Sequence, residues 1–446
     1  MLDTAVQIIQ TLRAAGHEAL LAGGCVRDFL LGKDPKDYDV ATSATPEQVA
    51  ALFPGARTVG AHFGVVIVRL GEDHVEVATF RTDGSYKDGR RPQTVTFSTP
   101  EEDAKRRDFT INGIFRDPVN ERVIDFVGGL EDLRAGVLRA IGDPHLRFEE
   151  DRLRLLRAVR FATVLDFQIE PETWKAVRSH AAGIGDVSAE RIRDELVKIF
   201  LHPHRLRGFD LLVGSGLMAH VLPEILTLQG VEQPPQWHPE GDVFVHTRLM
   251  LSLLPEQVSL PLVLSVLLHD IAKPATFTVD ETGRIRFNGH DKLGAEMSAE
   301  ILRRLKFPND VIEPVTTIVE HHMGFKDVKK MRKSTLRRMM ARPTWEDELA
   351  LHRVDCLGSN GLLDNYEFMV ERREEFTRQP VLPLWLVNGG DLIKAGFEPG
   401  PELGKALTAV QNAQLDGVVT TREEALAWVA ENTGRMPGSH DSGGDA

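Results

Sequence analysis

The chain has 446 residues, of which 42% are hydrophobic and 27% are charged, a balance typical of globular proteins. This length favours two to four domains of roughly 100–200 residues each. Its apolar stretches are all shorter than about 18 residues, so the sequence predicts no membrane span. The formal net charge of −13 disfavours a uniformly basic surface for nucleic acid but does not exclude a local basic groove.

The amino-terminal segment and the cysteine content favour a cytoplasmic protein. The segment MLDTAVQIIQTLRAAGHEALL carries an acid early and has the pattern of an amphipathic helix, unlike a signal peptide. Cys25 and Cys356 are the two cysteines of the chain. Two cysteines cannot form a disulfide framework, so a reducing compartment is expected.

Strand patterns are concentrated in the first third of the chain. Short apolar or alternating segments bounded by turn residues predict strands. The expected strands are Ala19–Ala22, Val65–Leu70, His74–Phe80, Thr94–Phe97 and Val123–Phe126. From Phe148 onward the pattern is helical almost throughout. The sequence therefore predicts an α/β head followed by mostly helical domains.

Composition suggests where these domains divide. The segment QPPQWHPE, Gln233–Glu240, has three prolines in eight residues and is typical of a linker. The last residues, TGRMPGSHDSGGDA, lack apolar content and are predicted to be disordered. The expected units are a head (1–145), a helical neck and body (146–232), an all-helical domain (240–360), a helical C-terminal region (361–432) and a tail (433–446).

Two aspartates flank a tyrosine in the segment KDPKDYDV. On an extended strand, the side chains of Asp37 and Asp39 would point to the same face. Such carboxylates repel each other unless a cation lies between them, and Mg²⁺ takes carboxylates together with substrate phosphates. Glu76 is the best candidate for a third carboxylate, because it is an acid within an otherwise apolar strand. A solvated surface turn is the alternative interpretation of the aspartate pair alone.

The upstream segment LAGGCVRDFLLG favours the metal interpretation. Gly23 and Gly24 follow a short apolar strand and precede a helical run, so that backbone N–H groups and a helix N-terminus can face a triphosphate. Arg27 lies in the first turn of that helix. This order of a strand, a glycine turn, a helix and a strand with paired aspartates resembles the pattern of polymerase-beta-type nucleotidyltransferases.

Five ordered motifs resemble the class II tRNA nucleotidyltransferase and bacterial poly(A) polymerase family. The segment from LAGGCVRD to TPEQV resembles motif A of that family. The other four are RRDFTINGI (Arg106–Ile114), DFVGGLEDL (Asp125–Leu133), EEDRLRLLRAVRFA (Glu149–Ala162) and SAERIRDEL (Ser188–Leu196), which resemble motifs B to E. The resemblance covers roughly residues 15–225. It implies nucleotide addition to an RNA 3′ end, with Mg²⁺ held by Asp37, Asp39 and Glu76.

Motif B offers polar groups for the sugar and the phosphates of a nucleotide. Asp108 and Asn112 can hold a ribose, and Arg106 and Arg107 beside them suit phosphates. In the resembled family this motif discriminates ribose from deoxyribose. The nucleotide-binding residues expected from motifs A and B are Gly24, Arg27, Arg107, Asp108 and Asn112.

Motif D places a row of polar residues at steps of three, which brings them near one face of a helix. The row consists of Asp151, Arg154, Arg157 and Arg160. Leucines and a valine fill the gaps, so the arginines are expected to be buried against the nucleotide site. All four are expected to contribute to nucleotide binding.

The resemblance gives two residues of this row a specific role. It implies that Asp151 and Arg154 hydrogen-bond the base edge of CTP or ATP. An acid accepts from the exocyclic amine, and an arginine donates to ring nitrogen and carbonyl groups. UTP and GTP present the wrong donors. Motif E is expected to support the motif D helix through Glu190 and Arg191.

The product of the reaction is suggested by two further segments. FRTDGSYKDGRRPQTVTF (Phe80–Phe97) resembles the flexible loop of CCA-adding enzymes and is not shortened as in CC-only enzymes. Bacterial poly(A) polymerases carry a basic stretch after motif A, where this chain has GAHFGVVIV (Gly60–Val68). CCA addition to tRNA from CTP and ATP is favoured, with poly(A) synthesis and A-only addition as alternatives.

Histidines and aspartates recur in the helical region between residues 240 and 360. An imidazole or carboxylate in an apolar setting is costly unless it is paired. The segments FVHTRLML, LLHDIAKP, NGHDKLGAE, VEHHMG and LHRVDCLG hold them in the order of the HD superfamily. The resemblance implies an all-α metal-dependent phosphohydrolase domain. Its expected ligands are His246, His269, Asp270 and Asp355, with His290 and one of His321 or His322 for a second ion.

The imidazole-rich ligand set favours a transition metal such as Ni²⁺, Mn²⁺ or Fe²⁺. The resemblance implies 2′,3′-cyclic phosphodiesterase, 2′-nucleotidase or phosphatase activity, and an inert domain is the alternative. The segment VKKMRKSTLRRMMAR (Val328–Arg342) contains seven basic residues and no acid. It either lies along RNA phosphates or forms a solvated helix face. The sequence leaves the oligomeric state open.

Overall fold

Two units divide the chain in the computed structural model, which describes residues 1–58, 64–84, 95–377 and 382–433. The first unit contains Met1–Thr227 with two short later segments, Pro255–Val258 and Ile301–Phe307. The second contains Leu228–Leu254, Ser259–Glu300 and Pro308–Ala446. The centre of the expected flexible loop, the start of Gly60–Val68 and nearly all of the expected tail lie outside the described residues.

A seven-stranded sheet forms the head within the described residues, in the order β3-β4-β5-β2-β1-β8-β9. The inner strand β1 (Ala19–Ala22) is buried along its whole length, which accounts for its continuous apolar sequence ALLA. It runs antiparallel to β2 (Asp39–Thr42) and β8 (Ile114–Asp117), whereas β2 runs parallel to β5 (Asp73–Thr79). The remaining strands of the head are β3 (Arg57–Thr58), β4 (Val65–Leu70) and β9 (Arg122–Asp125), with a separate ribbon of β6 (Arg81–Asp83) and β7 (Val95–Phe97).

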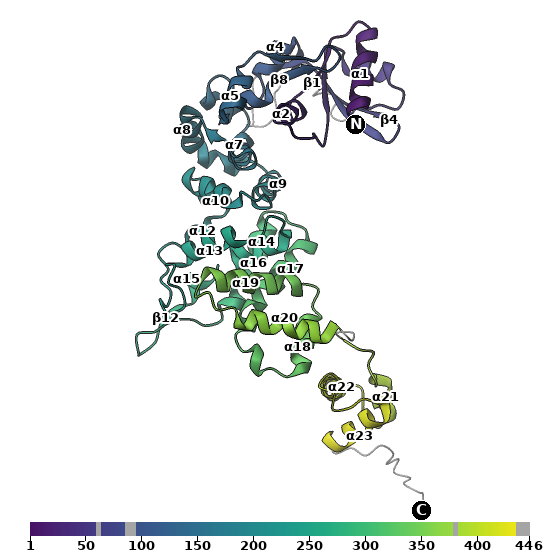
Figure 1. Ribbon diagram of the computed structural model, residues 1–446, viewed down its shortest axis with the longest axis vertical. Coiled ribbons are helices and arrows are strands. Elements are labelled where there is room, and N and C mark those ends of the chain that lie inside the picture. The colour runs from purple at the N-terminus through teal and green to yellow at the C-terminus, as the bar shows by residue number, and fades with distance from the viewer. Residues whose placement is uncertain (59–63, 85–94, 378–381, 434–446) are drawn as a thin grey trace, which may run out of the picture. The chain divides into compact units, whose positions relative to one another are not determined.

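Helix α1 (Leu2–Ala14) covers part of this sheet with its apolar face. Ala5, Ile8, Ile9 and Leu12 recur at helical spacing and are fully buried. Figure 1 shows α1, in purple, alongside the strands of the head. The other helices of the head are α2 (Gly24–Leu30), α3 (Pro46–Leu52), α4 (Pro100–Lys105) and α5 (Gly129–Ala135), with a 3-10 turn at Thr110–Asn112.

The rest of the first unit is built around helix α7 (Leu153–Leu165), which packs against α9 (Ala189–Phe200) and α10 (Arg205–Gly214). Gly208 permits the close approach of α10, because a Cβ there would lie 2.3 Å from Cγ2 of Ile199. The other elements are α6 (Pro144–Glu150), α8 (Pro171–His180), α11 (Met218–Val221), α12 (Pro223–Leu226) and a parallel pair of β10 (Val137–Leu138) with β11 (Gln168–Ile169).

The second unit is almost wholly helical in its described part. Its helix α14 (Leu260–Leu268), with the sequence LPLVLSVLL, is apolar on nearly all sides and is therefore buried. It packs against α13 (Val243–Leu253), α17 (Asn309–His321) and α19 (Trp345–Gly358). The neighbouring elements are α15 (Lys273–Thr276), the hairpin of β12 (Phe277–Val279) and β13 (Ile285–Phe287), and α16 (His290–Arg304).

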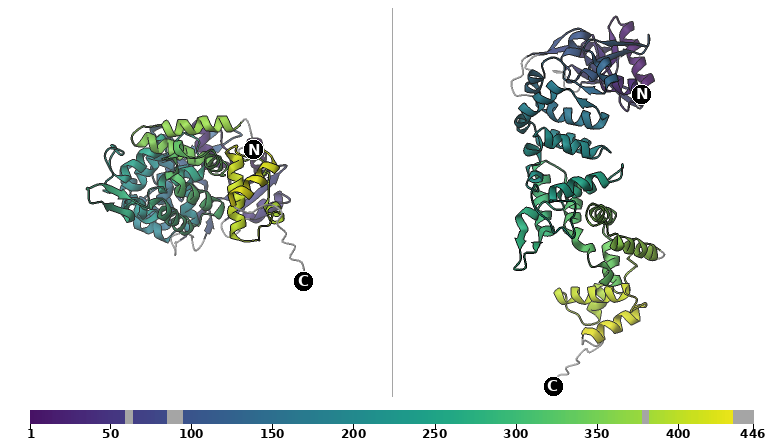
Figure 2. Two further views of the ribbon diagram at one scale, coloured as in Figure 1. Left: turned by 90° about the horizontal axis from the view of Figure 1, so that it is seen from below. Right: turned by 60° about the vertical axis from the view of Figure 1, so that its left-hand side comes forward.

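Two smaller apolar clusters stabilise the C-terminal part of the second unit. One joins α18 (Lys333–Met340), α19 and α20 (Asp364–Thr377) around Phe325 and Phe376. The other joins α21 (Gly389–Lys394), α22 (Pro401–Leu415) and α23 (Arg422–Thr433) around Leu392 and Val410. Helices α22 and α23, yellow in Figure 2, pack against each other.

The predicted α/β head with helical regions after it is confirmed. The segment Gln233–Glu240 is irregular, but it is not a free linker because it belongs to the second unit. Gln233 is only 5% exposed and accepts a 2.6 Å hydrogen bond from Nζ of Lys273. No helix in the described part of the chain combines the length and the hydrophobicity needed to cross a membrane.

Candidate active sites

The first site lies where β2 and β5 run side by side. Asp39 is the first residue of β2 and pairs with Glu76 of β5 in the parallel register. The third carboxylate therefore comes from the neighbouring strand. Asp39 is exposed to solvent at the start of the strand, but desolvation by its neighbours and the negative charge of Glu76 raise its pKa to about 6, against the opposing effect of Arg107. The repulsion between the two carboxylates is what a bound cation would relieve.

Asp37 lies outside the strand, which differs from the expected continuous extended segment. The backbone bends at Lys36 and Asp37, and β2 begins only at Asp39. The charge of Asp37 still contributes to the raised pKa of Asp39. Among the described residues, no group of three metal-ligating atoms within 4.8 Å of one another includes Asp37, Asp39 or Glu76. The three carboxylates are therefore neighbours, but their oxygen atoms do not all lie within 4.8 Å of one another.

The glycine turn allows an arginine to approach the carboxylates. Gly23 has a φ of +74°, a conformation that favours glycine, and α2 begins at Gly24. A Cβ at Gly23 would lie 3.1 Å from Nη1 of Arg107 and 3.8 Å from Oδ2 of Asp39. The missing side chain thus leaves room beside a guanidinium and a carboxylate, as the close approach of a triphosphate requires.

Arg107 is held in place from behind by Asp103. The Nε and Nη2 atoms of Arg107 donate to Oδ2 of Asp103 at 3.1 and 2.9 Å. Asp103 is 1% exposed. Although burial opposes ionisation of this carboxyl, the charges of Arg107 and Arg106 lower its pKa. Asp103 was not identified from the sequence. Its spacing of four residues before Arg107, which would bring the two side chains together on a helix, was the available signal.

Asp108 and Asn112 form part of a hydrogen-bonded group. Asp108 accepts from Nε and Nη2 of Arg157 at 2.9 and 2.6 Å and from Nδ2 of Asn112 at 3.0 Å. Although burial opposes ionisation, the charge of Arg157 holds the pKa of Asp108 well below its usual range. Oδ1 of Asn112 in turn accepts from Nη1 of Arg27 at 2.7 Å. The two expected ribose-binding residues are therefore oriented by two of the expected arginines.

Asp151 and Arg154 line one pocket of about 320 Å³. Asp151 lies just before α7, where its Oδ1 accepts from the backbone N–H of Leu153 and its Oδ2 from Arg191 at 3.2 Å. Arg154 is 8% exposed and donates to Oε2 of Glu150 at 2.9 Å. Both side chains are thus fixed before any base arrives. The pocket is lined by Arg106, Arg107, Asp108, Asp151, Leu153, Arg154, Arg157 and Arg191.

Motif E contacts the motif D segment through Arg191, as expected, and through Glu195, which was not expected. Glu190 is exposed near the start of α9. Glu195, five residues further along, is 3% exposed and accepts from Nε of Arg160 at 2.6 Å. Arg160 therefore ties two helices together and does not line the pocket described above. Arg191 does lie at the predicted place, against Asp151.

The second site is a cluster of imidazoles and carboxylates in the second unit. The atoms of His246, His269 and Asp270 that can bind a metal lie within 4.8 Å of one another, and all three residues are buried. Nε2 of His246 lies 3.2 Å from Oδ1 of Asp355, and Nε2 of His269 lies 3.1 Å from Oδ2 of Asp270. Both Nε2 atoms are buried, and despite these short distances neither makes a hydrogen bond of acceptable geometry in the described part of the chain. Such buried, unsatisfied nitrogens fit a metal ion.

A second group of ligand atoms shares the central aspartate. Asp270, His290 and His322 also lie within 4.8 Å of one another, and the Nε2 atoms of His290 and His322 are 3.1 Å apart. Burial and the charge of His269 lower the pKa of His322 to about 4, so this ring is neutral and able to bind a metal. His321 is outside both groups, and its Nδ1 lies 2.8 Å from the carbonyl oxygen of Thr317. The structure therefore brings His322, and not His321, to the cluster.

Three of the four clustered histidines are oriented in the same way. The Nδ1 atoms of His269, His290 and His322 contact the carbonyl oxygen of the residue three positions earlier, at 3.0, 2.7 and 2.6 Å. This contact turns each Nε2 toward the cluster, as metal-ligating histidines require. His246 differs, because its Nδ1 contacts Oε1 of Glu240 at 2.7 Å. Although burial opposes protonation of this ring, Asp355 and Glu240 raise the pKa of His246 to about 9.

Sequence reasoning missed further residues beside this cluster. Lys273 is 6% exposed, and its Nζ lies 2.7 Å from Oδ2 of Asp270. Its position three residues after Asp270 on a helical run was the available signal. Glu240 and His238 lie in the segment that was interpreted as a linker, and its prolines obscured them.

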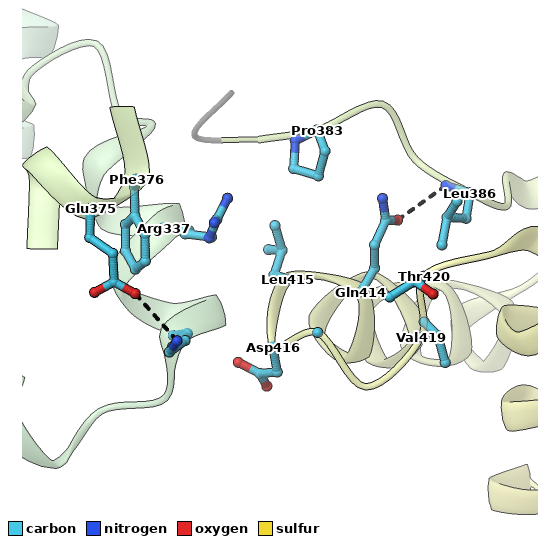
Figure 3. Close-up of a pocket in the computed structure, with 12 residues that line it drawn as sticks. Arg337, Glu375, Phe376, Pro383, Leu386, Gln414, Leu415, Asp416, Val419 and Thr420 are labelled. Atoms are coloured by element: carbon cyan, nitrogen blue, oxygen red, sulfur yellow. Dashed lines mark hydrogen bonds and ion pairs between the residues drawn. The ribbon is translucent and has the colours of Figure 1, made fainter. Parts of the chain in front are cut away.

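A further pocket of about 530 Å³ in the second unit contains none of the predicted site residues. Figure 3 shows Arg337 and Phe376 on one side of it and Gln414 and Leu415 on the other. The guanidinium of Arg337 lies 4.4 Å from the centre of the Phe376 ring. Part of the basic segment thus lines this pocket, while its apolar residues Leu336, Met339 and Met340 are buried in the adjacent cluster.

Comparison with protein families divides the chain in the same order. The family model for the poly A polymerase head domain matches residues 19–139. The model described as "Probable RNA and SrmB-binding site of polymerase A" matches residues 166–228. The HD domain model matches residues 243–353, and a model for tRNA nucleotidyltransferase domain 2 matches residues 382–430.

Individual proteins resemble the chain over nearly its whole length. The CCA-adding enzyme of Geobacillus stearothermophilus is 33% identical over 432 residues, covering 96% of each chain. The A-adding tRNA nucleotidyltransferase of Deinococcus radiodurans is 35% identical over 441 residues, covering 94% of this chain and 97% of that one. The crystal structure of the Bacillus stearothermophilus CCA-adding enzyme in complex with CTP has a TM-score of 0.72 and 30% identity, covering 96% of each chain.

Proposed function

The chain is a nucleotidyltransferase of the family that contains the CCA-adding enzymes, and we propose that it completes the CCA end of tRNA from CTP and ATP. The observation that carries this proposal is the pocket in which Asp151 and Arg154 are fixed beside Arg107. An acid and an arginine can recognise the shared amine-bearing edges of cytosine and adenine without a template. The tRNA 3′-hydroxyl would attack the α-phosphate and release pyrophosphate.

The carboxylates of the head fit a pair of Mg²⁺ ions. Asp39 and Glu76 are direct neighbours whose repulsion raises the pKa of Asp39, and Asp37 adds a third negative charge. We propose that these three residues hold the ions, which when bound would polarise the phosphate and lower the pKa of the attacking hydroxyl. Arg107, anchored by Asp103, would orient the triphosphate across the glycine turn.

Addition of A alone is the second candidate function. It is favoured by the A-adding relative, which is as similar to this chain as the CCA-adding relatives are. The two functions are separated by incubating the purified protein with tRNA transcripts that end at the discriminator base, at C74 or at C75, each with CTP or ATP alone. Incorporation of CTP on the shortest transcript supports CCA addition. Incorporation limited to ATP on the transcript ending in CC supports A-only addition, and a long A tail supports poly(A) synthesis.

We further propose that the HD domain hydrolyses phosphoesters with the help of a transition metal such as Ni²⁺, Mn²⁺ or Fe²⁺. The support is the convergence of His246, His269 and Asp270 with the buried, unsatisfied Nε2 atoms of both histidines. Imidazole ligands suit these metals better than they suit Mg²⁺. Asp355, 3.2 Å from Nε2 of His246, would complete the set, and Lys273, 2.7 Å from Asp270, would contact a phosphate oxygen. An inert domain remains the alternative.

The hydrolase proposal is tested on chelator-treated full-length protein. Hydrolysis of a 2′,3′-cyclic nucleotide and of a 2′-nucleotide is measured with Mg²⁺, Ni²⁺, Mn²⁺ or Fe²⁺ added. Activity with a transition metal supports the proposal. No hydrolysis with any metal would support the inert domain.

The partner that follows from these activities is tRNA. The basic segment Val328–Arg342, which includes α18, is proposed to lie along its phosphates. A cytoplasmic location is proposed as well, since Cys25 and Cys356 are both free thiols.

A further inference from the structure

The segment before α13 places a carboxylate against one of the clustered histidines. Glu240 and His238 precede the HD match at residues 243–353 and were not among the ligands suggested by the sequence. The side chain of Glu240 is only 8% exposed. Its burial needs an explanation, because a charged carboxylate is rarely taken out of water without a partner.

Glu240 meets His246 through the nitrogen that does not face the cluster. Oε1 of Glu240 lies 2.7 Å from Nδ1 of His246, and Nδ1 of His238 lies 2.9 Å from the same oxygen. The rings of His238 and His246 pack edge to face at 5.0 Å. A carboxylate accepts from Nδ1 only when that nitrogen carries a proton. Nε2 of His246, which faces Asp355, is therefore the nitrogen that would bind a metal once it has released its own proton.

This contact distinguishes His246 from its neighbours. The other three clustered histidines present Nδ1 to the backbone carbonyl of the residue three positions earlier in the chain. Such a contact is supplied by local geometry. The nearer partner of Nδ1 of His246 is instead the charged side chain of Glu240 at 2.7 Å, and the carbonyl oxygen of Gly358 lies further away at 3.3 Å. A carboxylate hydrogen-bonded to a ligand imidazole fixes the ring and strengthens nitrogen donation.

We propose that Glu240 is a positioning residue of the HD metal centre, which holds His246 with Nε2 directed at the metal, and that His238 anchors Glu240. This inference rests on the metal-binding function proposed above. It assigns a role to the segment Gln233–Glu240, which would close the metal centre from outside the HD match.

The test measures metal affinity and does not depend on hydrolysis. Ni²⁺ alone is titrated by calorimetry into chelator-stripped full-length protein at one fixed pH. Glu240→Gln keeps the size of the side chain but removes its charge, and affinity is expected to fall by about 10- to 100-fold. Glu240→Asp should recover part of the loss. The exposed Glu232→Gln, at the residue just before this segment, is the matched control and should bind as the wild type does.

A double-mutant cycle separates positioning from general damage to the fold. In a His246→Ala background, Glu240→Gln should change the affinity by less than about twofold, because the ring that it positions is gone. Thermal unfolding of each variant checks that the domain stays folded. If Glu240→Gln left the Ni²⁺ affinity unchanged, or reduced it by the same factor in the His246→Ala background as in the wild type, the role of Glu240 would be overturned. The proposed metal centre itself would still stand. A wild type that binds no Ni²⁺ would overturn both the metal centre and this inference.

Discussion

At the scale of single residues, the carboxylate pair of β2 and β5 concentrates negative charge that the nucleotidyltransferase reaction can use. Asp39 is central, because it neighbours Glu76 and lies within reach of the Arg107 guanidinium across Gly23. Asp39→Ala should reduce the addition of both C and A by at least about a thousandfold, since an electrostatic term of several kcal/mol is lost. Incorporation of radiolabelled CTP and ATP into tRNA measures the effect.

The control for this variant is Asp34→Ala, an exposed aspartate of the same connecting segment. It should retain wild-type addition. A circular dichroism spectrum equal to that of the wild type shows that Asp39→Ala remains folded. Normal incorporation by Asp39→Ala would rule out Asp39 as a metal ligand.

Base selection also belongs to the residue scale. Asp151→Ala and Arg154→Ala should each relax the preference for CTP and ATP over UTP and GTP by about 10- to 100-fold in kcat/KM. In the wild type, the wrong base leaves a polar group of the pocket unpaired, and this penalty disappears when the group is removed. Affinity for tRNA should change much less. The measurement compares kcat/KM for the four nucleotides. An unaltered ratio in both variants would place base selection elsewhere.

At the scale of elements, buried polar contacts join segments that are far apart in the sequence. Asp117 of β8 accepts from Nη1 of Arg13 of α1 at 2.9 Å and from Nδ2 of Asn120 at 2.8 Å. Although burial opposes it, these contacts lower the pKa of Asp117 to about 2. Because its pKa is lower in the folded chain than in the unfolded chain, the ionised Asp117 stabilises the fold. This stabilisation is fully present above about pH 4 and is lost as the pH falls toward 2.

The consequence is a pH-dependent effect of Asp117→Ala. The variant should be less stable than the wild type by up to about 2 kcal/mol near neutral pH, and this difference should shrink below about pH 4. Urea midpoints at a series of pH values measure it, with the exposed Glu72→Ala as the control. A difference that stays constant down to about pH 3 would contradict the role assigned to the Asp117 charge.

At the scale of the whole molecule, the two sites lie in separate units. The head carboxylates and the base pocket belong to the first unit, and the histidine cluster belongs to the second. His269→Ala combined with Asp270→Ala removes two metal-binding side chains and should abolish hydrolysis and Ni²⁺ binding. Nucleotide addition to tRNA should stay within about twofold of wild type, since no group of the first site is altered. Loss of addition in a folded double mutant would show that the two units depend on each other.

Much of the architecture and the chemistry could be predicted from local pattern alone. The apolar run ALLA, the glycine turn and the acid within VEVATF predicted β1, the start of α2 and the carboxylate partner of Asp39, because strand and helix periods decide which side chains share a face. The regular row of arginines predicted cations beside Asp151. Arg154 and Arg157 line the pocket with Asp151, whereas Arg160 contacts Glu195 instead. These features depend on residues that are close in the sequence or that follow a fixed period.

Contacts between elements were decided only by the tertiary structure. Glu195, and not Glu190, reaches Arg160, and His322, and not His321, reaches Asp270. Each step along a helix turns the side chain by about 100°, so only the packing against other elements determines which of several candidate positions enters a site. Glu240 gave no pattern at all, because a proline-rich segment has no period, and its place against His246 exists only once that segment has packed onto α13.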